Sequence, residues 1–386
     1  MIMSTRIYFD NSATTPLDPR VREAMLPFLD NIFGNPSSMH LDGLEARQAV
    51  EYARGQLADL IGAGTDEIVF TASGTEASNL ALAGFTRAQP PGCHIITTAI
   101  EHPAVLMACR ALERSGVAIT RLPVGGDGIV DPAALAVALR PTTRLVSVMA
   151  ANNVVGTLQP IAELALITRN HGAVFHCDAV QAVGKIPLDM RTLPVDLLSL
   201  SAHKFHGPKG VGALYIRKGV RLSPLIHGGG QEKGLRSATE NVAGIAGLGA
   251  AAAIAANGMS AETARLVCLR DRLLDRLLQR IPQAYLIGHR YRRLPGHLCL
   301  GIDGREGETI KLLMALDDAG IAVSTGSACS ASHGSEPSYI LSAMGYDQLR
   351  ARGSLRITLG RFNTEKEVDR FIDVFAAQII NKPEKR

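Results

Sequence analysis

A lysine that directly follows an apolar run is the first residue whose position suggests chemistry. Residues 197–209 read LLSLSAHKFHGPK, so a predicted buried strand is followed at once by Ser201, His203 and Lys204. Ligands of open α/β sheets bind beyond the carboxyl ends of the strands, so we expect these side chains to line a crevice. A lysine amine in a partly desolvated pocket can form a Schiff base, the linkage that pyridoxal 5'-phosphate (PLP) requires. An ordinary exposed lysine at a strand end would give the same pattern.

An aspartate ends the preceding apolar run in the same way. AVFHCD ends in Asp178, which Gln181 follows three residues later. A carboxylate at this place can pair with a protonated pyridine nitrogen and keep the ring an effective electron sink. The alternative for Asp178 is the N-cap of the next helix. An acid and a lysine at the ends of successive strands favour a cofactor site more than either residue does alone.

A short Gly-Thr turn offers a place for a phosphate. TASGTEASN follows the apolar run EIVF and begins a predicted helix, so that Gly74 and Thr75 would present N–H groups and a hydroxyl at its N-terminus. The stretch lacks the G-K-[ST] of a Walker loop. Simple capping of the helix by Ser73 or Thr75 is the alternative.

One of the six cysteines has a sequence environment unlike the others. Cys329 stands in VSTGSACSASHGSEPS, a polar stretch typical of a loop, where thiolate chemistry is feasible. The other five lie in or beside apolar stretches, and we interpret them as small packing residues. An incidental loop thiol is the alternative for Cys329. No C-x-x-C pair is present, so we predict neither a zinc site nor another metal site.

Three further residues could contact a cofactor or substrate. Arg356, in SLRITLG on a predicted strand, could clamp a carboxylate, although a structural salt bridge explains a strand arginine equally well. His102 and His203 could stack on a cofactor or donate a hydrogen bond to it, and each is also consistent with a purely structural role.

These residues require elements that bring them together, and the chain alternates β-branched runs with helical patterns. Helices are predicted at 19–29, 43–60, 75–87, 103–115, 131–139 and 161–170. Strands are predicted at 67–71, 94–98, 118–122, 144–149, 173–176 and 197–199. This alternation predicts an α/β fold with a mainly parallel sheet buried on both faces.

Length and composition limit the remaining classes. The chain has 386 residues, a net charge of +4 and 20% charged residues, which indicates a globular protein without the basic surface of a nucleic-acid binder. No signal peptide is visible, and the apolar run at 242–256 is interpreted as too short for a membrane span. We therefore expect a cytoplasmic protein without nucleic-acid or membrane partners. Asn257-Gly258 is interpreted as a break before an amphipathic helix at 260–280, and a final helix is predicted at 365–380.

The ordered motifs resemble a known family. FDNSATTPLDPRV, GNPSSMHLDGLEAR, EHPAVL, NNVVGTLQPI, CDAVQAVGKIPLD, SLSAHKFHGPKGVGALYIR, GGGQEKGLRSATENVAGI, STGSACSAS and SLRITLGRF are similar to the motifs of PLP-dependent cysteine desulfurases of the nitrogen-fixation and iron–sulfur-assembly type. The resemblance runs from about residue 7 to residue 375. It implies the aspartate-aminotransferase-like type I PLP fold, working as a homodimer. It also implies a large PLP-binding domain at 14–261 and a small domain formed by 1–13 and 262–386.

The resemblance also assigns roles to individual residues. Lys204 is similar to the Schiff-base lysine, Asp178 to the partner of the ring nitrogen, Gln181 to the contact of the ring hydroxyl and His102 to the histidine that stacks on the ring. The implied phosphate ligands are Gly74, Thr75, Ser201, His203 and, from the neighbouring subunit, Thr239. Asn153 and Arg356 are implied near the substrate carboxylate. Cys329 is implied as the nucleophile that takes sulfur from L-cysteine as a persulfide, leaves L-alanine, and passes the sulfur to a protein acceptor for iron–sulfur cluster assembly or another thiolation.

Other reactions on the same cofactor remain open. A selenocysteine lyase, a cysteine or cystine lyase, or an aminotransferase would not need Cys329. A subunit of a sulfur-transfer complex with little activity alone is a further alternative, against which the presence of Lys204, Asp178 and Cys329 together argues.

Overall fold

A seven-stranded sheet forms the centre of the larger part of the molecule. The computed structural model describes residues 6–326 and 337–380, and the strand order is β2-β8-β7-β6-β5-β3-β4. Only β8 runs antiparallel to its neighbours, β2 and β7. The strands are β2 (Ile68–Thr71), β3 (His94–Thr98), β4 (Ala118–Leu122), β5 (Thr143–Met149), β6 (Val174–Asp178), β7 (Leu197–Ser201) and β8 (Gly212–Ile216). The predicted α/β fold with a mainly parallel sheet is confirmed.

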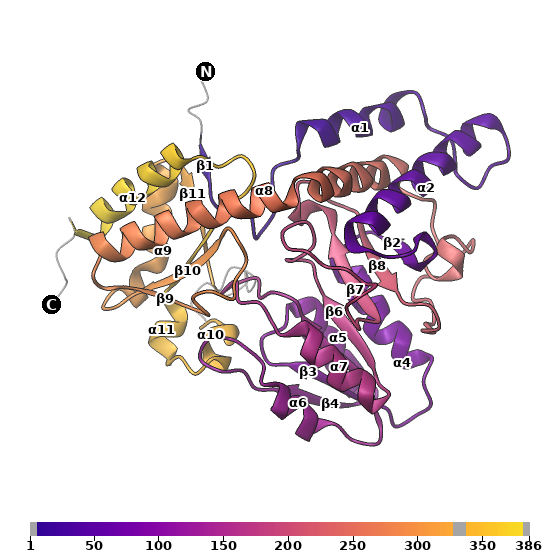
Figure 1. Cartoon of the computed structure of the whole chain (residues 1–386), viewed down its shortest axis with the longest axis horizontal. Coiled ribbons are helices and arrows are strands. Elements are labelled where there is room, and N and C mark those ends of the chain that lie inside the picture. Colours follow the sequence, from indigo (N-terminus) through magenta and orange to yellow (C-terminus); the bar gives the residue numbers. More distant parts are fainter. Residues whose placement is uncertain (1–5, 327–336, 381–386) are drawn as a thin grey trace.

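Helices connect these strands and cover both faces of the sheet (Figure 1). They are α1 (Pro19–Asp30), α2 (Leu41–Ile61), η1 (Thr65–Glu67), α3 (Gly74–Asn79), η2 (Leu80–Gly84), α4 (Phe85–Arg87), α5 (Pro103–Arg114), α6 (Pro132–Ala138), α7 (Ile161–His171) and η3 (Ala202–Lys204). The predicted helix at 75–87 is thus three consecutive pieces, with a π-helical turn in the middle.

Two apolar clusters account for the burial of the sheet on both sides. Phe70, Phe175 and Leu198 face a cluster that includes Leu57 of α2 and Leu164 of α7. On the other face, side chains of alternate strand positions meet α3, η2 and α5 through residues such as Leu80, Val105 and Leu214. The six strands other than β4 are therefore largely buried, as the non-alternating runs of the sequence predict. The prediction is wrong for the edge strand β4, where only Leu122 is buried.

A second, antiparallel sheet forms the smaller part of the molecule. Its strand order is β12-β13-β10-β9, and β1 (Ile7–Tyr8) pairs beside it in parallel with β11 (Ile321–Ala322). The remaining elements are η4 (Glu232–Gly234), β9 (Ala284–Leu286), β10 (His297–Ile302), η5 (Glu306–Glu308), α9 (Thr309–Asp318), β12 (Ser324–Thr325), α10 (Tyr339–Ala343), α11 (Gln348–Arg352), β13 (Ser354–Thr358) and α12 (Glu365–Ile380). An apolar cluster of its own includes Phe9, Leu273, Leu316 and Phe371.

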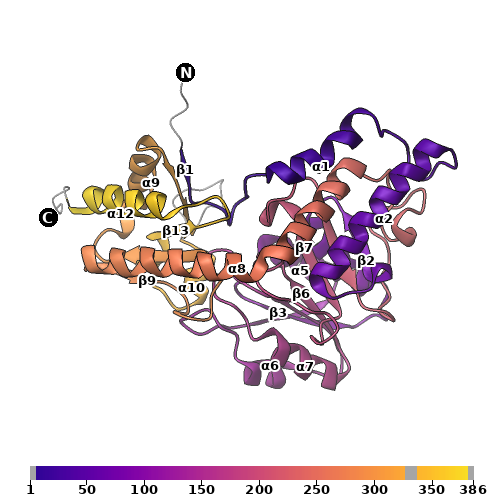
Figure 2. The same cartoon turned by 45° about the horizontal axis from the view of Figure 1, so that its top comes forward.

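One long helix, α8 (Val242–Arg280), reaches from the large sheet to the small one (Figures 1 and 2). Its first part packs against α1 and α2, and its leucines at 266, 269, 273, 274 and 277 enter the small cluster. The predicted break at Asn257-Gly258 is therefore wrong. A glycine inside a helix costs only about 1 kcal/mol relative to alanine, which the burial of both flanking parts offsets.

This helix also bears on two other expectations. The predicted domain boundary between residues 261 and 262 falls inside α8, and the two-domain division stays a prediction. The continuous helix contains a stretch long and apolar enough to cross a membrane, so the expectation that the run is too short is wrong on length. Half of that stretch is buried inside the protein, as in the core helix of a globular protein.

Candidate active site

A cavity of about 500 Å³ opens where β5, β6 and β7 end, between the two sheets. Ten predicted site residues line it: Gly74, Thr75, His102, Asn153, Asp178, Gln181, Ser201, His203, Lys204 and Arg356. β6 and β7 each run two residues further than predicted, so that Asp178 and Ser201 are the last residues of their strands. The strand-end rule therefore located one common site from separate sequence motifs.

Lys204 is held at the cavity by the N-terminal segment of the chain. β7 leads through the short turn η3 into Lys204, whose Nζ donates hydrogen bonds to the carbonyl oxygens of Ser12 (2.7 Å) and Ala13 (2.8 Å). The side chain is only partly exposed. The amine is thus positioned by backbone acceptors inside the cavity rather than directed into bulk solvent.

Asp178 is a buried carboxylate at the same edge of the sheet. Burial raises the pKa of Asp178 to about 6, although a hydrogen bond from the Val180 N–H and the nearby Lys204 act in the opposite direction. The Val180 N–H donates to Oδ1 at 3.0 Å within a turn, and the described residues between β6 and β7 form no helix, so the N-cap alternative for Asp178 is wrong. A buried acid of this kind gains from a cationic partner, such as a protonated ring nitrogen.

The two histidines of the site are neutral at physiological pH. Burial lowers the pKa of His102 to about 4, and Lys204 acts in the same direction. His102 caps α5, where its Nδ1 accepts from the Ala104 N–H at 3.1 Å. Burial likewise lowers the pKa of His203 to about 4, and one of its ring nitrogens lies 3.1 Å from Thr14 Oγ1. Neutral imidazoles can stack on an aromatic ring or accept a proton without adding charge to the cavity.

The turn before α3 provides a close-fitting lining. A Cβ added at Gly74 would lie 2.6 Å from Val180 Cγ2 and 3.4 Å from Ser201 Cβ, so only glycine fits without displacing its neighbours. Ser73 caps the helix through its Oγ, which accepts from the Glu76 N–H at 3.1 Å. The capping role therefore belongs to Ser73, and Thr75 is left to the cavity.

Gln181 lies in a network that sequence reasoning did not find. Its Nε2 donates to the Ser12 carbonyl oxygen at 2.9 Å, and its Oε1 accepts from Ser12 Oγ at 3.3 Å and from Lys185 Nζ at 3.1 Å. Burial lowers the pKa of Lys185 to about 7, and Lys204 and Arg356 act in the same direction. The orientation of the Gln181 amide is thus fixed by neighbours on both sides.

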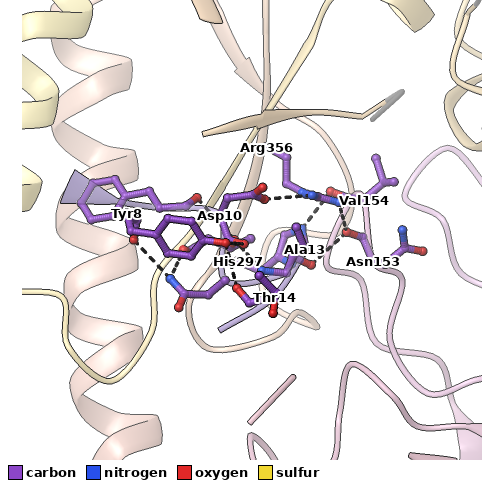
Figure 3. Close-up of polar contacts among 12 residues, drawn as sticks. Tyr8, Asp10, Ala13, Thr14, Asn153, Val154, His297 and Arg356 are labelled. Atoms are coloured by element: carbon purple, nitrogen blue, oxygen red, sulfur yellow. Dashed lines mark hydrogen bonds and ion pairs between the residues drawn. The ribbon is translucent and has the colours of Figure 1, made fainter. Parts of the chain in front are cut away.

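Arg356 also lines the cavity, and Figure 3 shows its polar contacts with Asp10 and Asn153. It is 2% exposed and lies on β13, as predicted. Its Nη1 donates to the Asn153 carbonyl oxygen at 3.0 Å and its Nη2 to Asp10 Oδ1 at 2.9 Å. The structural salt bridge that the sequence left open is therefore present, and the same guanidinium lines the cavity.

Two predicted residues are not among those that line the cavity in the described part of the chain. Thr239 is exposed and does not line the cavity of its own chain. Cys329 lies outside the described residues. Among the other cysteines, Cys93, Cys109, Cys177 and Cys299 are buried, but Cys268 is exposed on α8. Its assignment as a packing residue is wrong because it lies off the helix face that carries Leu266, Leu269 and Leu273.

A buried acid behind the cavity was also missed. Glu101 Oε1 accepts from Thr98 Oγ1 at 2.8 Å and from the Met149 N–H at 3.0 Å. Burial raises the pKa of Glu101 to about 8, and the carboxylate of Asp178 contributes to the rise. No sequence pattern marks Glu101, Lys185, Asp10 or Ser12 as site residues, because each is identified only by what the fold brings beside it.

The cavity fits PLP. It holds an amine, a buried carboxylate, neutral imidazoles and a lining that only glycine permits, all within one space. Lys204 would bind the aldehyde carbon, Asp178 would face the ring nitrogen, and Gly74 with Thr75 would take the phosphate.

The comparisons with known proteins agree with this site. The model of the class-V aminotransferase family matches residues 7–371. A cysteine desulfurase IscS from Dictyoglomus turgidum is 50% identical, over 98% of this chain and 96% of its own length, and one from Methanosarcina thermophila is 48% identical, over 97% and 92%. A solved NifS-like protein matches with a TM-score of 0.91 and 40% identity over 98% of this chain and all of its own. The structure of SspA in complex with cysteine matches with a TM-score of 0.81 and 33% identity over 93% of this chain and all of its own.

Proposed function

The chain belongs to the class-V aminotransferase family and is a PLP-dependent cysteine desulfurase, and we propose that the cavity between its sheets takes sulfur from L-cysteine and delivers it to Cys329. The carbon–sulfur bond of the substrate breaks and a sulfur–sulfur bond to Cys329 forms, so that L-alanine and a Cys329 persulfide are the products. The observation that carries this proposal is that Lys204, Asp178 and Arg356 line one cavity.

The cofactor side of the cavity supplies the means of releasing the substrate's α-proton. PLP, when bound, links to the substrate amine and stores the electron pair that the α-carbon gives up. Lys204 Nζ lies in the cavity and would be the base that takes the α-proton. The carboxylate of Asp178 is buried and would oppose loss of a proton on the ring nitrogen, and neutral His102 would face the ring without adding charge.

The opposite side of the cavity orients the substrate. Arg356 and Asn153 are joined by a hydrogen bond, and the guanidinium is the cation that suits the substrate's carboxylate. Holding the carboxylate at one end of the substrate and the amine at the other fixes the α-proton in relation to Lys204.

The chain acts, in this proposal, as a cytoplasmic homodimer that passes the persulfide sulfur to a protein acceptor. Thr239, which is exposed away from its own cavity, would reach the phosphate site of the neighbouring subunit. Exposed apolar side chains around α1 and α2 support a partner surface there, since Phe33, Met39 and Leu41 are each more than 80% exposed. The small excess of positive charge is consistent with a protein acceptor rather than a nucleic acid.

The test compares two cysteines in the PLP-loaded enzyme. Wild-type protein incubated with L-cysteine is expected to form alanine and to carry a persulfide on Cys329, detected by mass spectrometry of the unreduced peptide. Cys329→Ala is expected to lose sulfur transfer, whereas Cys268→Ala, which removes the exposed thiol of α8, is expected to keep it. Undiminished sulfur transfer in Cys329→Ala, or a persulfide found only on Cys268, would overturn the proposal. Release of free sulfide with pyruvate and ammonia in Cys329→Ala at the wild-type rate would indicate a lyase instead.

A further inference from the structure

The FDNSATTP motif contains an acid to which the mechanism above gives no role. Asp10 follows β1 and forms a backbone bridge with Thr358, the last residue of β13. The next residues tie the segment to the same strand: Asn11 Nδ2 donates to the Thr358 carbonyl oxygen at 2.8 Å, and the Ser12 N–H donates to Thr358 Oγ1 at 2.9 Å. The backbone around Asp10 is therefore fixed two residues from Arg356.

The side chain of Asp10 is directed at Arg356 (Figure 3). The carboxylate oxygen Oδ1 lies 2.9 Å from Arg356 Nη2, and both residues line the cavity. The Arg356 side chain is 2% exposed and that of Asp10 is 19% exposed, so the pair sits at the boundary between protein and cavity. Tyr8 supports it from behind, because its hydroxyl donates to the Asp10 carbonyl oxygen at 3.0 Å.

The guanidinium keeps donor capacity for a ligand. Within the described residues its hydrogen bonds go from Nη1 to Asn153 and from Nη2 to Asp10, and Nε is buried without a partner. An arginine carries five N–H groups in a rigid planar guanidinium. Hydrogen bonds at two of them therefore fix the direction of the remaining N–H groups. A carboxylate that enters the cavity would meet an oriented fork instead of a flexible side chain.

The charges around Arg356 explain why an acid is needed there. Lys204 and Lys185 contribute further positive groups near the cavity, and Arg356 is close enough to lower the pKa of Lys185. A buried guanidinium among other cations is costly unless it is paired. Asp10 provides that pairing while one face of the arginine remains available.

We propose that Asp10 is a positioning residue for the binding of the substrate's carboxylate: it holds Arg356 in the orientation that receives this carboxylate. This inference rests on the proposed function, because it takes an amino acid as the ligand. The substrate carboxylate binds beside the Asp10–Arg356 pair and does not displace it. Recognition therefore requires that the guanidinium of Arg356 bind two carboxylates at once, that of Asp10 and that of the substrate.

The test uses two ligands that differ only in the carboxylate. L-Alanine and ethylamine carry the same amine on a two-carbon frame, and each is titrated into PLP-loaded enzyme while the absorption of the cofactor is followed. Asp10→Ala is expected to raise the dissociation constant of L-alanine about tenfold and to leave that of ethylamine unchanged. Asp10→Glu, which restores an acid, is expected to recover part of the loss.

A double-mutant cycle tests whether Asp10 acts through Arg356. In the Arg356→Lys background, Asp10→Ala is expected to produce no further loss of L-alanine affinity, because the fork that it orients is gone. An equal loss for L-alanine and ethylamine, tighter L-alanine binding in Asp10→Ala, or full additivity in the cycle would each overturn the inference.

These results are separable from the proposed function. Binding of L-alanine does not require sulfur transfer, so an enzyme that fails to form a persulfide can still show the carboxylate-specific effect of Asp10. Conversely, active persulfide formation with an Asp10→Ala variant that binds L-alanine like the wild type would reject the inference alone.

Discussion

The two sides of the cavity are built in different ways. The cofactor wall, formed by Gly74, His102, Asp178 and Lys204, comes from residues that follow β2, β3, β6 and β7 at one edge of one sheet. The substrate wall, formed by Asp10 and Arg356, joins residues 346 positions apart in the chain. A parallel sheet places strand-end residues together through its topology alone, whereas the substrate wall requires two segments to dock and pair their charges.

The walls also differ in how they treat charge. On the cofactor wall, burial leaves both histidines neutral and makes Asp178 a weaker acid than usual. On the substrate wall, a buried cation is paired with an acid. The cofactor wall therefore suits proton and electron movement, and the substrate wall suits binding by opposite charge.

The largest expected effect lies on the cofactor wall. Asp178→Asn removes the charge that faces the ring nitrogen and is expected to lower kcat for alanine formation by a factor on the order of 10²–10³, with a much smaller change in L-alanine affinity. Steady-state assays combined with L-alanine titration measure both quantities. If Asp178→Asn weakened L-alanine binding as much as it slowed turnover, the separate roles of the two walls would be contradicted.

The sequence predicts residues of the cofactor wall more readily than those of the substrate wall, because the two walls are built in different ways. Asp178 and Lys204 each follow an apolar run, so the strand-end rule identifies them from the sequence alone. Asp10 also follows a short apolar run, Ile7 to Phe9, but its role depends on a bridge to Thr358 that no local pattern encodes. The helix break predicted at Gly258 failed for the same reason, because packing against distant elements outweighs a local propensity.

A smaller effect is expected from the fit of Gly74. Gly74→Ala places a Cβ against Val180 Cγ2 and is expected to raise the dissociation constant of PLP about tenfold, since overpacking of this kind costs about 1–3 kcal/mol. Titration of the apoprotein with PLP measures it. The double variant Gly74→Ala/Val180→Ala makes room for the new methyl group and should recover most of the affinity. If the second substitution gives no recovery, contact with Val180 is not the cause.

The smallest expected effect is on stability and depends on pH. Glu101 has a pKa of about 8 in the folded protein against an ordinary value of 4.5, so folding retains a proton there that the unfolded chain loses. Its contribution to the free energy of unfolding therefore falls as pH rises from about 4.5 to about 8 and is constant above. Glu101→Gln removes this pH-dependent loss of stability, because an amide does not lose a proton in this range.

Thermal unfolding of both proteins across this range provides the measurement. The melting temperature of Glu101→Gln should exceed that of the wild type by on the order of a few degrees at about pH 9 and match it near pH 4.5. The two proteins should match at low pH because the protonated acid and the amide carry the same charge. A difference in melting temperature that is the same at all pH values would mean that folding does not change the pKa of Glu101.

The continuous helix α8 has a mechanical consequence for how the cavity can open. Because the helix is embedded in the apolar cluster of each sheet, it connects the two walls directly, and it bends between its two parts (Figure 2). A helix tolerates gentle curvature, and a sharp hinge would break its hydrogen bonds. Gly258, which has no neighbouring atom within 4 Å of a Cβ position, lies between Ala255 of the larger cluster and Leu266 of the smaller one. Any separation of the substrate wall from the cofactor wall would therefore have to bend this helix or pull one of its ends out of an apolar cluster.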